Sequence, residues 1–257
     1  MTQSPKMPPR LAQAIVDSCE PGCTRMSANP KGVTTFESIL GGAHRRKSRK
    51  GRLNFARGER EMAFFRSASR FDASPDIEGA GVYLRPPQMA DFSEWAALRE
   101  RSRAFLAPWE PEWPTDDLTR GAFRNRLRRY ANEAQEDSGY SFLIFRDGDH
   151  VLLGGVTLSN VRRGVAQSAN LGYWIGAEHA RRGYMSAAVA ALIPFAHGQL
   201  RLRRIEAACL PENAVSIRLL EKLGFKHEGY ARQYLCIAGK WQDHRLYARL
   251  SSDPLQP

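Results

Sequence analysis

The amino-acid sequence predicts an α/β protein built on a mixed sheet with helices on its faces. Two observations lead to this class. From residue 81 onward, strand-length apolar segments alternate with segments of helical period, in the order β-α-α-β-β-β-α-β-α-β-β. Hydrophobic residues make up 42% of the 257 residues, which is close to the ordinary globular value and allows a core to form.

The first expected elements are a short strand and a helix. Residues 82–86 form an apolar strand that the pair Pro86-Pro87 ends. Asp91 is a good N-cap for a helix whose apolar residues recur at helical spacing up to about Phe105. Three prolines in the loop 107–114 exclude a helix there.

A second helix and an antiparallel meander follow. Thr115 or Asp116 is expected to cap this helix, which is apolar on one side and rich in arginine on the other. Asp147-Gly148-Asp149 is a hairpin turn signal between the first two strands of the meander. The three strands are expected at 140–146, 150–161 and 168–176.

The remaining elements are two helices and three strands. A helix from about Gly183 to Gly198 is almost entirely apolar, so we expect it to be buried, and Pro194 should kink it. A shorter helix over 213–223 ends at Gly224, which occupies the C′ position. The strands are expected at 204–210, 225–237 and 241–250, with a turn between the last two.

Residues 1–79 differ in texture from the rest of the chain. They show no sustained period, and the segment 41–52 holds six cations and no carboxylate, so we expect a basic, disordered extension. The extension is either an arm that contacts RNA or the ribosome or a solvated tail; alternatively, translation begins at Met62. The expected domain is 80–251, followed by a short tail at 252–257.

Composition limits the classes of protein that fit. No run of about 18 apolar residues exists, and the N-terminus lacks the pattern of a secretory signal. His179 and His244 are too isolated to propose as metal ligands, so no metal is expected. The few, scattered cysteines indicate a reducing cytoplasm. Within the net charge of +11, residues 81–257 carry 24 Lys and Arg against 19 Asp and Glu. This mild surplus suits an acidic partner, such as ribosomal RNA or a polyanionic cofactor, or is solvated surface. Four cysteines are too few and too scattered for a disulfide framework or a zinc site: Cys19, Cys23, Cys209 and Cys236.

One segment carries a chemical signal: a strand, the loop 178–186 and the buried helix that follows. A helix N-terminus presents unpaired N–H groups and a partial positive charge, which suit a diphosphate. Gly183 allows a tight turn, and Arg181 and Arg182 add charged donors for phosphate oxygens. Alone, this pattern is about equally typical of a loop that only caps a helix.

A second segment lies downstream at 211–225. Asn213 is a plausible N-cap, and the apolar residues of the helix are explained as core. That interpretation does not explain why this helix follows the first loop at this distance and in this strand order. Together, the two segments resemble the GNAT superfamily of N-acetyltransferases, and the resemblance covers residues 81–251.

The resemblance implies an acetyl-CoA site on a GNAT fold with a splayed central strand pair. Pantetheine is then expected to add to a strand edge like another strand. The family loop pattern, Gln/Arg-x-x-Gly-x-Gly/Ala, falls on residues 180–185 and departs from it at Ala180 and Met185. The implied cofactor residues are Trp174, Ile175, Gly176, Arg181, Arg182, Gly183, Tyr184, Met185, Ser186, Asn213 and Ser216.

Longer patterns at 103–111, 224–232 and 239–244 resemble one branch, the ribosomal-protein-alanine N-acetyltransferases. This branch implies acetyl transfer from acetyl-CoA to the N-terminal alanine of a small-subunit ribosomal protein. Two other functions remain open. One is acetyl transfer to a small-molecule amine, such as an antibiotic or a polyamine. The other is a non-catalytic module that binds acyl-CoA and associates with the ribosome.

Acetyl transfer to an α-amine needs only a weak base, because the pKa of the amine is about 7.7–8.0. Glu110 in the Pro-rich loop and Glu206 on the strand beside the cleft are the candidate bases. Alternatively, either one only attracts the ammonium group of the peptide or is plain surface. Ser216 is the candidate proton donor to the departing thiolate, or it caps the helix. Tyr173 could pair with the amine or belong to the core.

Overall fold

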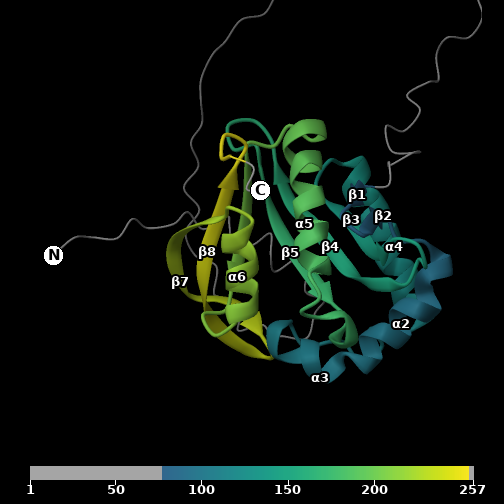
Figure 1. The fold of residues 1–257 in the computed structure, drawn as a ribbon. Helices are drawn as coiled ribbons and strands as arrows, with labels where there is room; N and C mark the ends of the chain where they lie inside the picture. Colours follow the sequence, from purple (N-terminus) through teal and green to yellow (C-terminus); the bar gives the residue numbers. More distant parts are fainter. Residues whose placement is uncertain (1–76, 255–257) are drawn as a thin grey trace, which may run out of the picture. The chain divides into compact units, whose positions relative to one another are not determined.

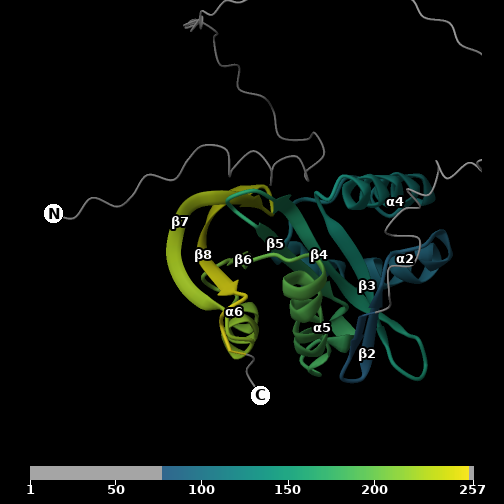
Figure 2. The ribbon, with the colours of Figure 1, turned by 90° about the horizontal axis from the view of Figure 1, so that it is seen from above.

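The computed structural model describes residues 77–254, which form an eight-stranded mixed sheet covered by helices on both faces (Figures 1 and 2). The strand order is β1-β2-β3-β4-β5-β6-β8-β7, and β5–β6 is the parallel pair among antiparallel ones. The predicted α/β class is therefore confirmed. The expectations for the basic segment 41–52, for Met62, and for Cys19 and Cys23 lie outside the described residues.

The strands follow the expected order, with one addition at the start. The added strand, β1, falls before the domain boundary expected at residue 80 and pairs with β2 across a turn in which Gly81 has φ +71°. Three residues are too short a segment for an alternating pattern to be recognised. The strands are β1 Ile77–Gly79, β2 Val82–Arg85, β3 Tyr140–Arg146, β4 Leu152–Arg162, β5 Ser168–Ile175, β6 Arg204–Cys209, β7 Lys226–Ile237 and β8 Lys240–Leu250.

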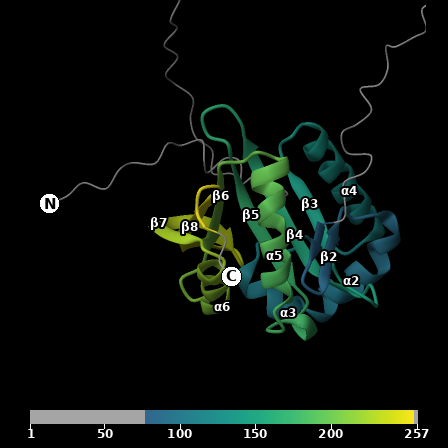
Figure 3. The ribbon, with the colours of Figure 1, turned by 45° about the horizontal axis from the view of Figure 1, so that its top comes forward.

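Two helices cover one face of the sheet, α5 (Tyr184–Pro194) and α6 (Ala214–Lys222), as Figures 1 and 3 show. Their apolar residues join those of the central strands in the larger core. The kink expected at Pro194 stays a prediction; α5 ends at this proline, and the chain continues as a π-helical turn, η4 (Phe195–Gln199).

The opposite face carries α2 (Phe92–Arg101) and α4 (Arg120–Gln135) (Figure 2). A second, smaller core lies beneath them. Its buried members are Trp95, Leu98, Phe123, Leu143, Phe145 and Leu152. Three short elements complete this side of the chain: η1 Met89–Asp91, α3 Arg103–Leu106 and η2 Ala107–Trp109.

The boundaries on this face differ from the predicted ones. The helix expected to run to about Phe105 is interrupted at Ser102, whose buried hydroxyl accepts a hydrogen bond from Ala177 N at 3.0 Å. The second helix is capped by Thr119, not by Thr115 or Asp116, because the Thr119 hydroxyl accepts from the N–H of the first turn. The Pro-rich loop contains a 3₁₀ turn, since a proline in the first turn loses no hydrogen bond.

Among residues 77–254, no helix has the length and apolar character needed to cross a bilayer.

Candidate functional site

The parallel strands β5 and β6 stay paired over only a short stretch. Residues 168–170 align with residues 204–206, and no pairing continues beyond Asn170, although β5 runs on to Ile175 and β6 to Cys209. The two strands therefore splay apart, as the resemblance implied. Backbone groups of β5 on this edge are left for another hydrogen-bonding partner.

A cavity of about 550 Å³ lies along this splay. It reaches from the N-terminus of α5, past the start of α6, to the last residues of β7 and to His244 in β8. It brings together most of the predicted cofactor residues, namely Trp174, Ile175, Arg181, Gly183, Tyr184, Met185, Ser186, Asn213 and Ser216. One ligand lying along the cavity would therefore meet both of the segments singled out from the sequence.

Two predicted cofactor residues do not line this cavity. The Gly176 N–H donates to Leu153 O at 2.8 Å, so it continues the β4–β5 ladder. A Cβ at Gly176 would lie 2.5 Å from Leu98 Cδ1, so the glycine allows α2 to pack closely against the end of β5. Arg182 is exposed at the surface beside the loop.

One end of the cavity suits a diphosphate. Arg181 and Gly183 adopt left-handed φ values of +63° and +85°, and this turn leads directly into α5. The first N–H groups of α5 have no carbonyl partner one turn earlier in the helix, because helical bonding begins with Ala187 N to Gly183 O. Arg218 and Lys222, one turn apart on α6, add two cations to this lining. The sequence analysis missed these two residues, although their i, i+4 spacing on a polar helix face was visible.

The departure of Met185 from the family loop pattern has a packing explanation. Its side chain is 8% exposed and belongs to the larger core, whereas its backbone lies at the start of α5. The thioether therefore fills space behind the loop, and the backbone donors on which phosphate binding depends stay in place.

Asn213 and Ser216 have separate positions at the start of α6. Asn213 Oδ1 accepts from Ser216 N at 3.0 Å, which makes Asn213 the N-cap. Ser216 Oγ lies 2.6 Å from the Tyr173 hydroxyl, so the serine side chain is not the cap. Burial raises the pKa of Tyr173 above its ordinary value, and burial raises the pKa of the neighbouring Cys209 thiol to about 11. Both groups are protonated at neutral pH.

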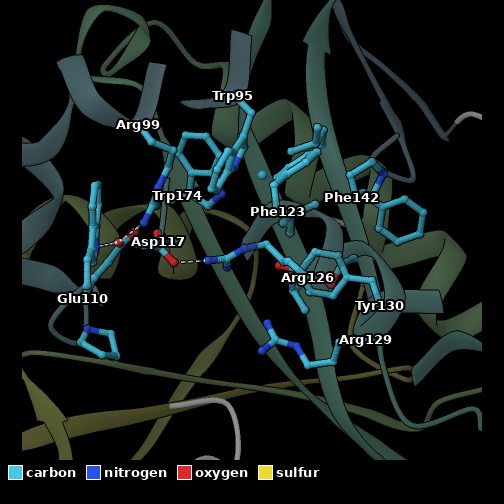
Figure 4. A pocket seen from close by; sticks show the side chains of 18 of the residues that line it. Trp95, Arg99, Glu110, Asp117, Phe123, Arg126, Arg129, Tyr130, Phe142 and Trp174 are labelled. Carbon is cyan, nitrogen blue, oxygen red and sulfur yellow. Dashed lines mark hydrogen bonds and ion pairs between the residues drawn. The ribbon is translucent and has the colours of Figure 1, made fainter. Parts of the chain in front are cut away.

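Glu110 is held in an ion pair with Arg99. Its carboxylate accepts from Arg99 Nη1 at 2.9 Å and Nη2 at 2.8 Å, and Trp113 Nε1 donates to it at 2.7 Å. The Arg99 guanidinium lies over the rings of Trp113 and Trp174. These groups line a second cavity of about 280 Å³, which also contains the Asp117–Arg126 ion pair (Figure 4). Glu110 and Trp174 line both cavities.

Glu206 is occupied by two arginines. Arg162 Nη2 donates to Oε2 at 2.5 Å, and Arg204 Nε donates to Oε1 at 2.7 Å. Glu206 is the last residue of β6 that pairs with β5, opposite Asn170, and it lines neither of the two cavities.

The Pro-rich loop closes over the β7–β8 turn. Ala238 N donates to Glu110 O at 3.0 Å, and a Cβ at Gly239 would lie 2.5 Å from Glu112 Oε1. The cavity end beneath this contact has apolar walls that include Phe105, Leu106, Trp109, Leu235 and Ile237.

His244 is a residue of this cavity that the sequence analysis considered only as a metal ligand. It is 2% exposed, and its Nδ1 lies 2.9 Å from Gln242 O. Because a carbonyl can only accept, Nδ1 carries the proton. No group of three or more His, Cys, Asp or Glu side chains within residues 77–254 is placed to hold a metal ion.

Comparison with known proteins gives a consistent result. The family model for the acetyltransferase (GNAT) domain matches residues 82–226. The chain is 36% identical over 180 residues to the probable N-acetyltransferase YjcK of Bacillus subtilis, covering 70% of this chain and 99% of that protein. It is 35% identical over 152 residues to the ribosomal protein uS5-alanine N-acetyltransferase of Escherichia coli, covering 59% of this chain and 78% of that protein.

Solved structures agree with these sequence matches. The ribosomal-protein-S5-alanine acetyltransferase of Vibrio fischeri has a TM-score of 0.65 at 30% identity, covering 71% of this chain and 100% of that one. RimJ of Mycobacterium smegmatis, solved in complex with CoA-disulfide, has a TM-score of 0.63 at 32% identity, covering 66% of this chain and 82% of that one.

Proposed function

Because the chain belongs to the GNAT family of N-acetyltransferases and is an acyltransferase, we propose that it moves the acetyl group of acetyl-CoA to a protein N-terminal α-amine. The acceptor we propose is the N-terminal alanine of a small-subunit ribosomal protein. The similarity to two enzymes named for ribosomal protein S5 alanine supports this choice.

The observation that carries the proposal is the single cavity along the splay of β5 and β6. Its cationic end offers the free N–H groups of α5 together with Arg181, Arg218 and Lys222, which fits the phosphates of coenzyme A. The unpaired edge of β5 fits the amides of pantetheine. Its apolar end fits a small, uncharged acceptor group.

Acetyl-CoA supplies an activated acetyl group: the C–S bond breaks as a C–N bond forms, giving an N-acetylated peptide and free coenzyme A. Within this chain, backbone N–H groups of β5 polarise the thioester oxygen. Ser216 Oγ, backed by the Tyr173 hydroxyl at 2.6 Å, donates a proton to the leaving sulfur.

The two carboxylates are assigned supporting roles in this proposal. Glu110 would have to give up bonds to Arg99 and Trp113 before it could take a proton. We propose that it fixes the Pro-rich loop over the cavity. Glu206 lies between Arg162 and Arg204 and is proposed to hold the strands together at the point where they diverge.

The proposal is tested by incubating the purified full chain with acetyl-CoA and peptides that copy the N-termini of small-subunit ribosomal proteins. We expect free thiol to appear and Ala-starting peptides to gain one acetyl group on the α-amine, located by tandem mass spectrometry. The matched control is the same peptide with a blocked N-terminus, which leaves only lysine amines available.

Three outcomes would contradict the proposal in different ways. Acetylation of the blocked peptide would mean a lysine acetyltransferase. Preference for polyamines or aminoglycosides over peptides in direct competition would favour a small-molecule acceptor. Tight binding of acetyl-CoA without transfer to any amine would favour a non-catalytic module.

A further inference from the structure

His244 lies in the acceptor end of the cavity in one defined protonation state. It sits on β8 opposite Ala231 of β7, one residue before Arg245, which pairs with the last residue of β6. Its Nδ1 donates to Gln242 O, so Nε2 carries the lone pair. Within residues 77–254, Nε2 of His244 has no hydrogen-bond partner, and part of its surface is accessible to solvent. Nε2 therefore faces the cavity.

The surroundings of His244 keep the ring neutral. Burial lowers its pKa below the ordinary value, and the Gln242 carbonyl and the Asp243 and Glu212 carboxylates oppose this only in part. Asp243 accepts bonds from the Tyr230 hydroxyl at 2.8 Å and from Gln233 N at 2.7 Å, so it is engaged on β7. A neutral imidazole with a free Nε2 is a proton acceptor at pH 7.

The other titratable groups near this end do not offer a comparable acceptor. Tyr234 of β7 contacts the His244 ring edge-on at 5.8 Å between centroids, and burial raises its pKa. Cys209 keeps its proton at neutral pH, since burial raises its pKa to about 11. Glu110 is engaged by Arg99 and Trp113. Unlike Tyr234, Cys209 and Glu110, His244 offers a lone pair that is available without breaking an existing bond.

We propose that His244 is the general base of the reaction, a role that rests on the proposed acetyl transfer to an α-amine. The acceptor enters as the neutral amine. As the amine nitrogen bonds to the thioester carbon, it becomes positively charged, and Nε2 of His244 takes one of the protons of the amine. The positive charge moves in this way to the imidazole ring, whose Nδ1–H stays bonded to Gln242 O. The C–S bond breaks, the sulfur receives a proton from Ser216, and solvent later removes the proton from His244 and restores the serine hydroxyl.

The test compares wild type with His244→Asn, which keeps an N–H near the Gln242 carbonyl but cannot take up a proton. His227→Asn is the matched control, because His227 lies on β7, is exposed and lines neither cavity. Steady-state kcat/KM is measured for an Ala-starting peptide from pH 5 to 9, alongside acetyl-CoA affinity and Tm. A positioned base contributes about 10²–10⁴-fold, so His244→Asn should lose at least about 100-fold in kcat/KM at pH 7.

The pH profile distinguishes a base from a structural residue. In wild type, the slope of log kcat/KM should steepen from one to two at a pH below the ordinary histidine pKa of about 6.5, because burial lowers the pKa of His244. His244→Asn should keep a slope of one throughout, and millimolar imidazole should restore activity to His244→Ala but not to Ser216→Ala. A His244→Asn enzyme that keeps the wild-type slope and rate would overturn the base and leave the acetyl transfer intact. A wild type that acetylates no α-amine would overturn both.

Discussion

Replacing Asn213 separates a structural role from a cofactor-binding role at the same residue. The side-chain oxygen caps α6 through Ser216 N at 3.0 Å, and the side-chain NH₂ remains available to a ligand in the cavity that Asn213 lines. Asn213→Ser keeps a capping oxygen but loses the NH₂ donor, whereas Asn213→Ala loses both. The two variants therefore differ in the cap alone.

The expected magnitudes follow from these two bonds. Loss of the cap in Asn213→Ala should cost about 0.5–2 kcal/mol of unfolding free energy. For a domain of this size, that corresponds to a fall in Tm of about 1–8 °C. Loss of one hydrogen bond to the cofactor, about 0.5–1.5 kcal/mol, should weaken coenzyme A binding by about 2- to 12-fold in both variants.

Thermal unfolding without ligand and calorimetric titration with coenzyme A measure the two effects independently. Asn213→Ser should unfold within about 2 °C of wild type and still bind coenzyme A more weakly. If Asn213→Ser binds coenzyme A as tightly as wild type while Asn213→Ala does not, the residue acts only through the helix cap, and the assignment of its NH₂ to the cofactor is wrong.

Two further predictions concern stability. Gly155→Ala should lower Tm, because its Cβ would lie 2.6 Å from Trp174 Nε1 and overpacking of this kind costs about 1–3 kcal/mol; Gly172→Ala, whose Cβ meets nothing within 4 Å, is the control and should unfold near the wild-type temperature. The pKa of Asp137 is held below its usual range by Arg163, so this ion pair stabilises the fold above about pH 4 and is lost as pH falls further. The Tm difference between wild type and Asp137→Asn should therefore shrink from pH 7 to pH 2.5, and a difference that stays constant would show that the charge of Asp137 does not stabilise the fold.

The features that could be predicted from the sequence are those that depend on neighbours in the chain. The hairpin turn at 147–149 and the αL glycine Gly224 each follow from local backbone chemistry. The start of α5 at Gly183 and the cap at Asn213 are local in the same sense.

The features that could not be predicted depend on partners far away in the sequence. Glu110 resembles a free carboxylate in a loop until Arg99 and Trp113 are placed beside it. The hydroxyl of Ser102, where the helix is interrupted, finds its partner in Ala177 N, 75 residues later. The sequence assigns His244 no role, because no second metal ligand stands near it along the chain. Its availability as a base arises from the fold, which buries the ring and bonds one nitrogen to a carbonyl two residues away.

The two ends of the cavity differ in charge, and this difference bears on the order of events in catalysis. Three cations, Arg181, Arg218 and Lys222, line the cavity together with the first residues of α5. At the acceptor end, the charge of Glu110 is compensated by Arg99. An ammonium ion entering this apolar end would lose its hydration without meeting a free anion, which favours the neutral amine. A strong carboxylate base is then unnecessary, because the proton that remains to be removed appears only as the C–N bond forms. A neutral imidazole suffices at that moment, and His244 is placed to supply it.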